Sequence, residues 1–108
     1  MTVSELREKL DLTVFALPDP ERQVTGGYAG DLLSWVMGNA GADCVWLTIM
    51  SGVNVCAVAV LTDAACVLLT EGVVPDGDLL ARAEAQGVNL LGTGGTTFDT
   101  AAALHALL

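Results

Sequence analysis

Basic side chains are scarce in this chain. Its 108 residues include four Lys and Arg against thirteen Asp and Glu, which gives a formal net charge of −9. Binding of DNA or RNA needs clustered cations that neutralise phosphates, and four scattered ones cannot provide them. The same scarcity argues against an anionic membrane surface and against a polyphosphate held by side chains. Any phosphate would have to be held by backbone N–H groups and helix N-termini.

Residues that carry nucleophilic or metal chemistry are also few. The only histidine, His105, lies near the end of the last predicted helix, so we expect a packing or surface role rather than a catalytic base. Cys44, Cys56 and Cys66 lie in apolar runs without a C-x-x-C pair, which indicates buried, reduced thiols of a cytoplasmic protein. No cluster of metal-ligating residues is visible, so we expect neither a metal site nor a cofactor.

The signatures of phosphate-binding loops are missing as well. The only lysine is Lys9, so no glycine is followed by the Lys with which a P-loop reaches a phosphate. The stretch GTGGTT at residues 92–97 lacks the third glycine of the dinucleotide-binding fingerprint, and it comes at the last strand.

Charge is also absent from residues 44–62, a run long enough to span a bilayer. Ser51, Gly52 and Asn54 interrupt the middle of the run, and no Lys or Arg borders either end as the positive-inside rule would require. We therefore interpret the run as a strand, a turn and a buried helix rather than a membrane span.

The chain has ample material for a core. Hydrophobic residues make up 53% of it and aromatic residues 5%, which predicts one domain over residues 1–108 with a core of Val, Leu, Ala and Cys. Strands are predicted at 12–17, 24–28, 43–50, 64–72 and 88–91, and helices at 2–10, 31–37, 53–62, 75–86 and 97–108. Alternation of helices with apolar strands predicts a three-layer α/β/α fold with a mostly parallel sheet of about five strands.

Local signals mark several helix ends. Thr2 with Glu5, and Thr96 with Asp99, have the spacing of a capping box. Asp31 is predicted to cap a helix that Gly38 and Asn39 close. In the helix at 75–86, Leu79, Leu80 and Ala83 are expected to face the core.

Four strand-to-helix junctions could form a binding site. Ligands of parallel α/β sheets bind beyond the carboxyl ends of the strands, where residues 28–31, 51–54, 70–72 and 93–96 would lie. The same glycines and polar residues are needed merely to turn the chain, so a pocket and a set of plain turns both remain open. The candidate ligand-binding residues are Thr25, Gly26, Gly27, Tyr28, Gly30, Asp31, Ser51, Asn54, Glu71, Gly94, Gly95 and Thr96.

Catalysis is a second role that two of these candidate residues could have. Glu71 follows an apolar strand and could be partly buried, which makes it, with Asp31, a possible acid–base residue. A loop carboxylate that binds a neighbouring backbone N–H is the alternative.

Trp35 and Met37 lie on a helix that is apolar nearly all round, with Tyr28 and Trp46 nearby in sequence. Such a helix lies either in a homodimer interface or in the interior.

The stretch ERQVTGGYAGDLLS at residues 21–34 resembles the DRTGG domain, which is similar to the N-terminal region of HPr kinase/phosphorylase. Residues 53–72 and 87–104 resemble later parts of the same family, so the resemblance covers nearly all of the chain. Two departures are visible: Glu21 stands where the motif has aspartate, and two residues separate Arg22 from Thr25.

The resemblance implies an α/β domain often attached to CBS, kinase or phosphatase domains, which senses or dimerises rather than catalyses. The kinase's phosphate-binding loop lies in its other domain, so kinase activity does not transfer to this chain. We therefore expect a regulatory ligand-binding module, a homodimer that senses a small anionic or nucleotide ligand beside a metabolic or redox enzyme. A purely structural interaction domain and a small enzyme that uses Glu71 or Asp31 are the alternatives.

Overall fold

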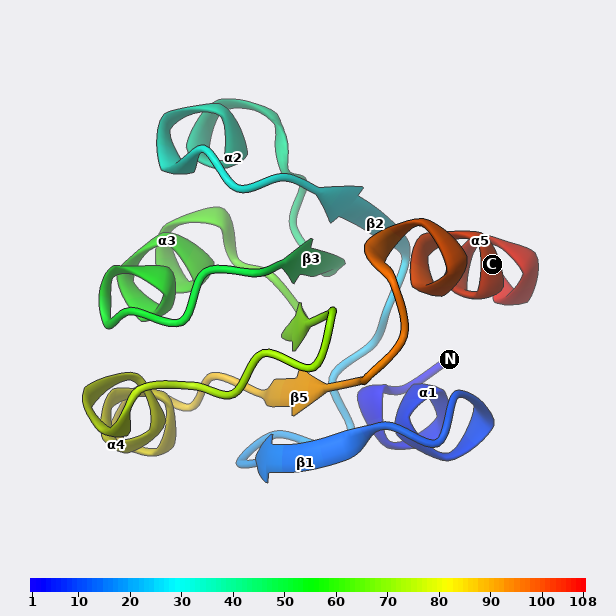
Figure 1. Cartoon of the computed structure of the whole chain (residues 1–108), viewed down its shortest axis with the longest axis horizontal. Helices are drawn as coiled ribbons and strands as arrows, with labels where there is room; N and C mark the ends of the chain where they lie inside the picture. Colours follow the sequence, from blue (N-terminus) through cyan, green and yellow to red (C-terminus); the bar gives the residue numbers. More distant parts are fainter.

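The computed structural model describes all residues from 1 to 108 as a five-stranded sheet between two layers of helices (Figure 1). This confirms the predicted fold class. The elements in chain order are α1 (Val3–Lys9), β1 (Thr13–Ala16), β2 (Gly26–Ala29), α2 (Leu33–Asn39), β3 (Cys44–Thr48), α3 (Asn54–Thr62), β4 (Cys66–Leu69), α4 (Gly77–Gln86), β5 (Leu90–Gly92) and α5 (Thr97–Leu107).

The sheet has the strand order β1-β5-β4-β3-β2, so β1 and β2 form its two edges. Strands β2, β3, β4 and β5 are parallel to one another, whereas β1 is antiparallel to β5. The parallel strands require a crossover between each pair, and α2, α3 and α4 provide these crossovers. The carboxyl ends of four strands therefore lie along one rim of the sheet.

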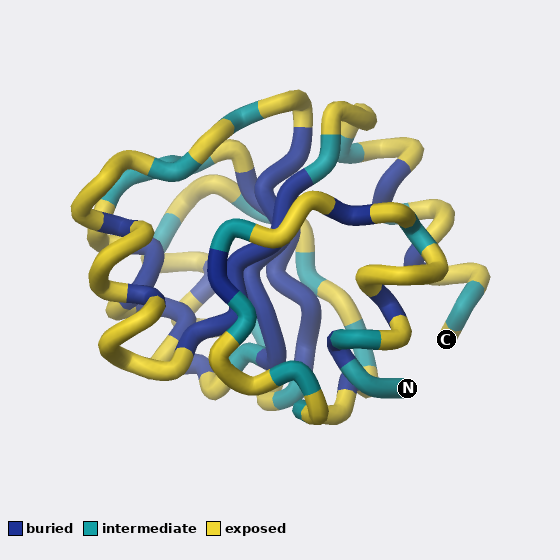
Figure 2. The backbone as a smooth tube through the Cα atoms, turned by 90° about the horizontal axis from the view of Figure 1, so that it is seen from below, coloured by how far each residue is buried: buried dark blue, intermediate teal, exposed yellow.

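Helices α2, α3 and α4 cover one face of the sheet, and α1 and α5 cover the other (Figure 1). Residues alternate between the two resulting cores, as strand geometry requires. In β3, which is buried along its whole length, Cys44 and Trp46 join the core under α2–α4, while Val45 and Leu47 join the core under α1 and α5. Figure 2 shows the buried residues along the central strands and the exposed residues on the outer helix surfaces.

The uncharged run at residues 44–62 forms β3, a turn and α3, as predicted. No helix is long and apolar enough to cross a membrane. The predicted helix caps are also present at two places. Thr2 and Glu5 form both bonds of a capping box, and the Thr96 hydroxyl accepts a hydrogen bond from the N–H of Asp99 at 3.1 Å.

Two local predictions were wrong. Asp31 does not cap α2, because its carboxylate binds β3 instead; Leu32 is the N-cap, without a side-chain bond, and the helix runs on through Gly38 and Asn39. Leu80 is exposed, since the buried pair of α4 is Leu79 with Ala83, one turn apart. Of the two alternatives left open for the aromatic residues near α2, interior packing holds for Trp46, which is fully buried and donates its indole N–H to the carbonyl of Gly30.

Candidate functional site

The four predicted junctions meet along the rim of the sheet. Neighbouring strands stay paired up to their ends: the N–H of Gly30 donates to Leu47, that of Thr70 to Thr48, and that of Thr93 to Leu69. This pairing places residues 30–31, 51–54, 70–72 and 93–96 side by side in the order of the strands. The sequence-based prediction of one shared rim is therefore correct.

Asp31 braces one end of this rim. Its Oδ1 atom accepts hydrogen bonds from the Thr48 hydroxyl at 2.7 Å and from the Ile49 N–H at 3.0 Å. The Thr48 hydroxyl in turn accepts a bond from the N–H of Met50 at 3.2 Å. The carboxylate thus joins the end of β2 to the end of β3 and is already engaged.

Glu71 braces the other end. Its carboxylate accepts a hydrogen bond from the N–H of Thr97 at 2.8 Å, and its own N–H donates to the carbonyl of Gly95 at 2.8 Å. Glu71 is exposed rather than partly buried, because this contact holds it at the surface over the first turn of α5. The expectation of a loop carboxylate on a neighbouring backbone N–H is confirmed, and Gly94, Gly95 and Thr96 lie beside it.

The middle of the rim is open. The backbone N–H groups of Gly52, Val53 and Asn54 donate to no acceptor within the protein, and α3 starts at Asn54 without a side-chain cap. The first N–H groups of a helix carry partial positive charge and need a partner. The backbone N–H groups of five predicted ligand residues donate to no acceptor within the protein, namely Asp31, Ser51, Asn54, Gly94 and Thr96. Of these, Asn54 lines the groove between α3 and α4.

A groove of about 460 Å³ leads away from this opening between α3 and α4. Its floor is apolar, and Arg82 lies in it without a carboxylate within 4 Å. The sequence contained no signal for Arg82 as a site residue, because its only visible relation was to Asp78 on the same helix. The groove combines free N–H groups, one guanidinium and an apolar surface, so it offers both an anion-binding and an apolar part.

The glycine-rich stretch lies mostly elsewhere. The N–H of Thr25 pairs with the carbonyl of Asp43 at the amino-terminal end of β3, so Thr25, Gly26 and Gly27 lie away from the rim. A Cβ atom on Gly27 would lie 2.9 Å from the Leu104 side chain of α5, whereas a Cβ atom on Gly26 would contact nothing. Gly27 therefore allows close packing of α5 on β2.

A second groove, of about 410 Å³, lies where β2 meets α5. It is mostly apolar, and the exposed His105 lines it, in agreement with a surface role for this histidine. Sequence reasoning missed this groove, although Phe98, Ala101, Ala102 and His105 recur at the spacing of one helix face. The lining residues are Gly27, Tyr28, Ala29, Leu47, Phe98, Ala101, Ala102, Leu104, His105 and Leu108.

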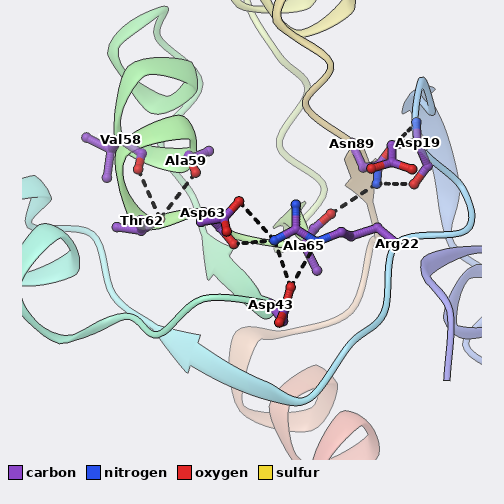
Figure 3. Close-up of polar contacts among 9 residues, drawn as sticks. All are labelled: Asp19, Arg22, Asp43, Val58, Ala59, Thr62, Asp63, Ala65 and Asn89. Carbon is purple, nitrogen blue, oxygen red and sulfur yellow. Dashed lines mark hydrogen bonds and ion pairs between the residues drawn. The ribbon is translucent and has the colours of Figure 1, made fainter.

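Arg22 holds together the opposite end of the sheet. Figure 3 shows its guanidinium between Asp43 and Asp63, at 2.7 and 3.0 Å from their carboxylates. Its Nη2 atom also donates to the carbonyl of Asp63 at 2.8 Å. The hydrogen bond to Asp43 is the main cause that raises the pKa of Arg22 above its usual value. The arginine of the DRTGG-like stretch is thus a structural clasp, far from the open part of the rim.

Asn89 has a similar role beside it. Its Oδ1 atom accepts from the N–H of Asp19 at 2.9 Å, and its Nδ2 atom donates to the carbonyls of Asp19 and Ala65 at 2.7 and 3.0 Å (Figure 3). Every polar atom of this buried side chain is paired, so Asn89 fixes the connection from β1 to β2 against β4.

The three cysteines are free and buried, as predicted. Burial raises the pKa of each thiol, that of Cys66 to about 12, so the reactive thiolate is disfavoured. No group of three or more His, Cys, Asp or Glu side chains is placed to hold a metal ion.

Trp35 and Met37 are 61% and 48% exposed, so α2 does not bury them in the interior. The alternative of interior packing is wrong for these two residues. They lie two positions apart on the helix and so point in different directions.

The comparisons with known proteins agree with this fold. The family model of the DRTGG domain matches residues 43–107. The crystal structure of the CBS and DRTGG domains of the regulatory region of Clostridium perfringens pyrophosphatase, complexed with its activator diadenosine tetraphosphate, superposes with a TM-score of 0.73. Sequence identity is 9%, and the match covers 95% of this chain but 45% of that one.

No curated protein matches the chain. The matched residues begin after the glycine-rich stretch and include β3 to α5, with the open part of the rim and the groove between α3 and α4. On the strength of this match over more than half of its residues, the chain belongs to the DRTGG domain family.

Proposed function

We propose that this domain is a non-catalytic regulatory module that senses a small anionic ligand, a nucleotide in the first place. It works as a homodimer beside a metabolic or redox enzyme in the cytoplasm. The observation that carries the proposal is the opening at the start of α3, where three consecutive backbone N–H groups lack a partner.

The surroundings of this opening favour a nucleotide over a simple anion. A phosphate on the N–H groups of Gly52, Val53 and Asn54 would lie at the end of the groove that contains Arg82. The apolar side chains of Ala57 and Val60 in the same groove offer a surface for a base. With one guanidinium and a strongly acidic chain, the site favours binding through backbone groups, and its affinity is expected to be modest.

The related solved structure supports the same class of ligand. That regulatory region is complexed with diadenosine tetraphosphate, an activator built of two nucleosides and a phosphate chain. Transfer of this ligand class to the present chain is part of our proposal.

The two acid–base candidates support a role without catalysis. The carboxylates of Asp31 and Glu71 both accept hydrogen bonds from the protein itself, so each is engaged in holding loops together. A purely structural interaction domain is the second candidate function, favoured by the exposed apolar side chains of α2.

A thermal-shift screen with nucleotides and small anions tests the proposal. Binding at one hundred times the dissociation constant stabilises a protein by about 2.7 kcal/mol, which raises the Tm of a domain of this size by roughly 10 °C or more. We expect such a shift with at least one nucleotide, and no shift with any compound would contradict a ligand-binding role.

Two matched variants locate the site. Gly52→Asp adds a carboxylate beside the free N–H groups and should abolish the shift by repelling the ligand. Gly41→Asp adds the same charge in the loop before β3, at the other end of the sheet, and should retain it. A Cβ atom contacts nothing at either position, so both variants should fold.

A further inference from the structure

The outer surface of α2 and α3 carries no ionised side chain. All thirteen acidic and four basic residues of the chain lie outside residues 32–42 and 44–62. Large apolar side chains are exposed there instead, and we refer to these six residues as the uncharged face. They are Leu32 at 58%, Trp35 at 61%, Met37 at 48%, Val53 at 37%, Val60 at 48% and Leu61 at 72% exposure.

Each of the two helices exposes part of the uncharged face, with Trp35 and Met37 on different sides of α2. Helices α2 and α3 are neighbours in the same layer (Figure 1). In α2, Val36 is buried and Leu33 packs against the core, which leaves Trp35 pointing away from the sheet. In α3, residues 55, 56, 58 and 59 are buried, so Leu61 points outward.

A surface helix normally has a polar outer side, whereas α3 is apolar all round. Val60 and Leu61 on its exposed side are as apolar as Val55 and Val58 on its buried side. Helices of this kind are buried, and α3 lacks the element that would bury its outer side.

We infer that the uncharged face is the surface through which a second copy of this chain binds. The inference rests on the homodimer in the proposed function and names its contact surface. Two chains that each carry a charge of −9 repel each other, and most approaches would bring carboxylates together. Contact through α2 and α3 brings no charged side chain of these helices into the interface.

The area is sufficient for such a contact. From their exposed fractions, the six side chains present roughly 450 Å² of apolar surface, when fully exposed aromatic and aliphatic side chains are taken at about 200 and 100–150 Å². A standard interface buries about 800 Å² per partner, of which about two thirds is apolar in homodimers. Without Met37, which points away from Trp35, the other five side chains still present roughly 380 Å², about 70% of the apolar area of such an interface.

The groove between β2 and α5 is the competing surface. It also exposes a large side chain, that of Phe98 at 82%. Asp99 follows Phe98 directly but lines a different cavity, and Asp31 likewise precedes Leu32, so a neighbouring carboxylate does not distinguish the two surfaces. The uncharged face exposes six large apolar side chains, whereas the groove exposes two, Phe98 and Leu108, so the apolar area favours α2 and α3.

Sedimentation velocity of the whole chain tests the inference. We expect a dimer at 50 µM, and a dissociation constant at least tenfold weaker in Trp35→Glu and in Trp35→Lys. The paired charges distinguish loss of the apolar contact from a change of net charge. Phe98→Glu is the control, because it places the same charge on an equally exposed aromatic position outside the face, and it should remain dimeric.

The outcomes separate the inference from the proposed function, because Trp35 does not line the groove that contains Arg82. A monomeric wild type, or a dimer that Phe98→Glu dissociates and Trp35→Glu does not, would overturn the inference. A nucleotide-dependent thermal shift in the same samples would leave ligand binding intact. Conversely, a dimer sensitive to Trp35→Glu without any thermal shift would contradict ligand binding alone.

Discussion

Gly27 is the glycine of the glycine-rich stretch at which a side chain would disturb the packing most. A Cβ atom at this position would lie 2.9 Å from the Leu104 side chain, so the missing side chain lets helix α5 pack closely on the strand here. Gly26, one residue earlier, has open space at the same place. Two adjacent glycines of one strand thus have different tasks, and their sequence alone does not distinguish them.

Substitution at these glycines should reveal the difference. We expect Gly27→Val to lower the free energy of unfolding by about 1–3 kcal/mol, because the added methyl groups overpack the contact with Leu104. Gly26→Val should change it by less than about 0.5 kcal/mol, since the position is open. Urea denaturation measures both, and equal losses would show that α5 does not depend on Gly27.

Because of Cys66, we expect the free energy of unfolding to fall at alkaline pH. Burial raises the pKa of its thiol from about 9 to about 12, so above pH 9 the unfolded chain loses a proton that the folded protein retains. The folded state is therefore fully favoured below pH 9, and stability should fall by about 1.4 kcal/mol per pH unit from this group as the pH rises towards 12.

Urea denaturation at pH 8 and pH 10 checks this dependence. Cys66→Ala should lower stability at pH 8 through the cavity it leaves, yet lose less stability than the wild type between the two pH values. Parallel losses in both proteins would mean that the thiol does not cause the alkaline dependence.

At the scale of elements, α5 depends on residues that come from other parts of the chain. Its first turn receives the carboxylate of Glu71, from the end of β4, and the hydroxyl of Thr96. Glu71 also adopts a left-handed backbone conformation with φ of 60°, which favours glycine. The contact with α5 offsets a local strain.

These two effects can be separated at one position. Glu71→Ala loses the carboxylate and keeps the strain, so we expect a loss of about 1–2 kcal/mol. Glu71→Gly loses the same contact but relieves the strain, and should be more stable than Glu71→Ala by about 1 kcal/mol. Urea denaturation gives the energies, and hydrogen exchange at Thr97 should be faster in both variants; an unchanged exchange rate would exclude the capping role.

The elements were largely predictable, and their contacts were not. Hydrophobic periodicity and capping residues act over a few positions, which is why all five helices and all five strands were predicted. Asp31 shows the limit: its local spacing favours a helix cap, but Thr48 and Ile49 compete for the carboxylate from 17 and 18 residues away. Arg22, with partners at Asp43 and Asp63, and the groove beside Arg82 depend on similar long-range contacts that leave no local pattern.

At the scale of the whole molecule, the proposed ligand site and the proposed dimer surface share α3. Val53 and Leu61 belong to the uncharged face and also line the groove beside Arg82. A second copy on this face would cover part of the groove, so a bound ligand would contact both chains or be enclosed by them. Binding at one place should then change affinity at the other.

We therefore expect a saturating nucleotide to tighten the dimer at least fivefold in sedimentation velocity. By reciprocity, a chain held monomeric by Trp35→Glu should bind the same nucleotide more weakly by the same factor in calorimetry. Arg82→Ala, which removes the only guanidinium of the groove and lies outside the uncharged face, should dimerise normally and show a smaller effect of nucleotide. Equal nucleotide affinity in monomer and dimer would show that the two sites are independent.

The pairing of β1 with β5 has a consequence for how the chain folds. Strand β1 pairs only with β5, so β1 cannot join the sheet before residues 90–92 have been synthesised. During synthesis, β1 therefore has no strand to pair with, while β2, β3 and β4 can already pair with one another. Long-range pairing of this kind slows folding and leaves strand edges open for a time. The amino-terminal segment is the part of this domain that would be completed last.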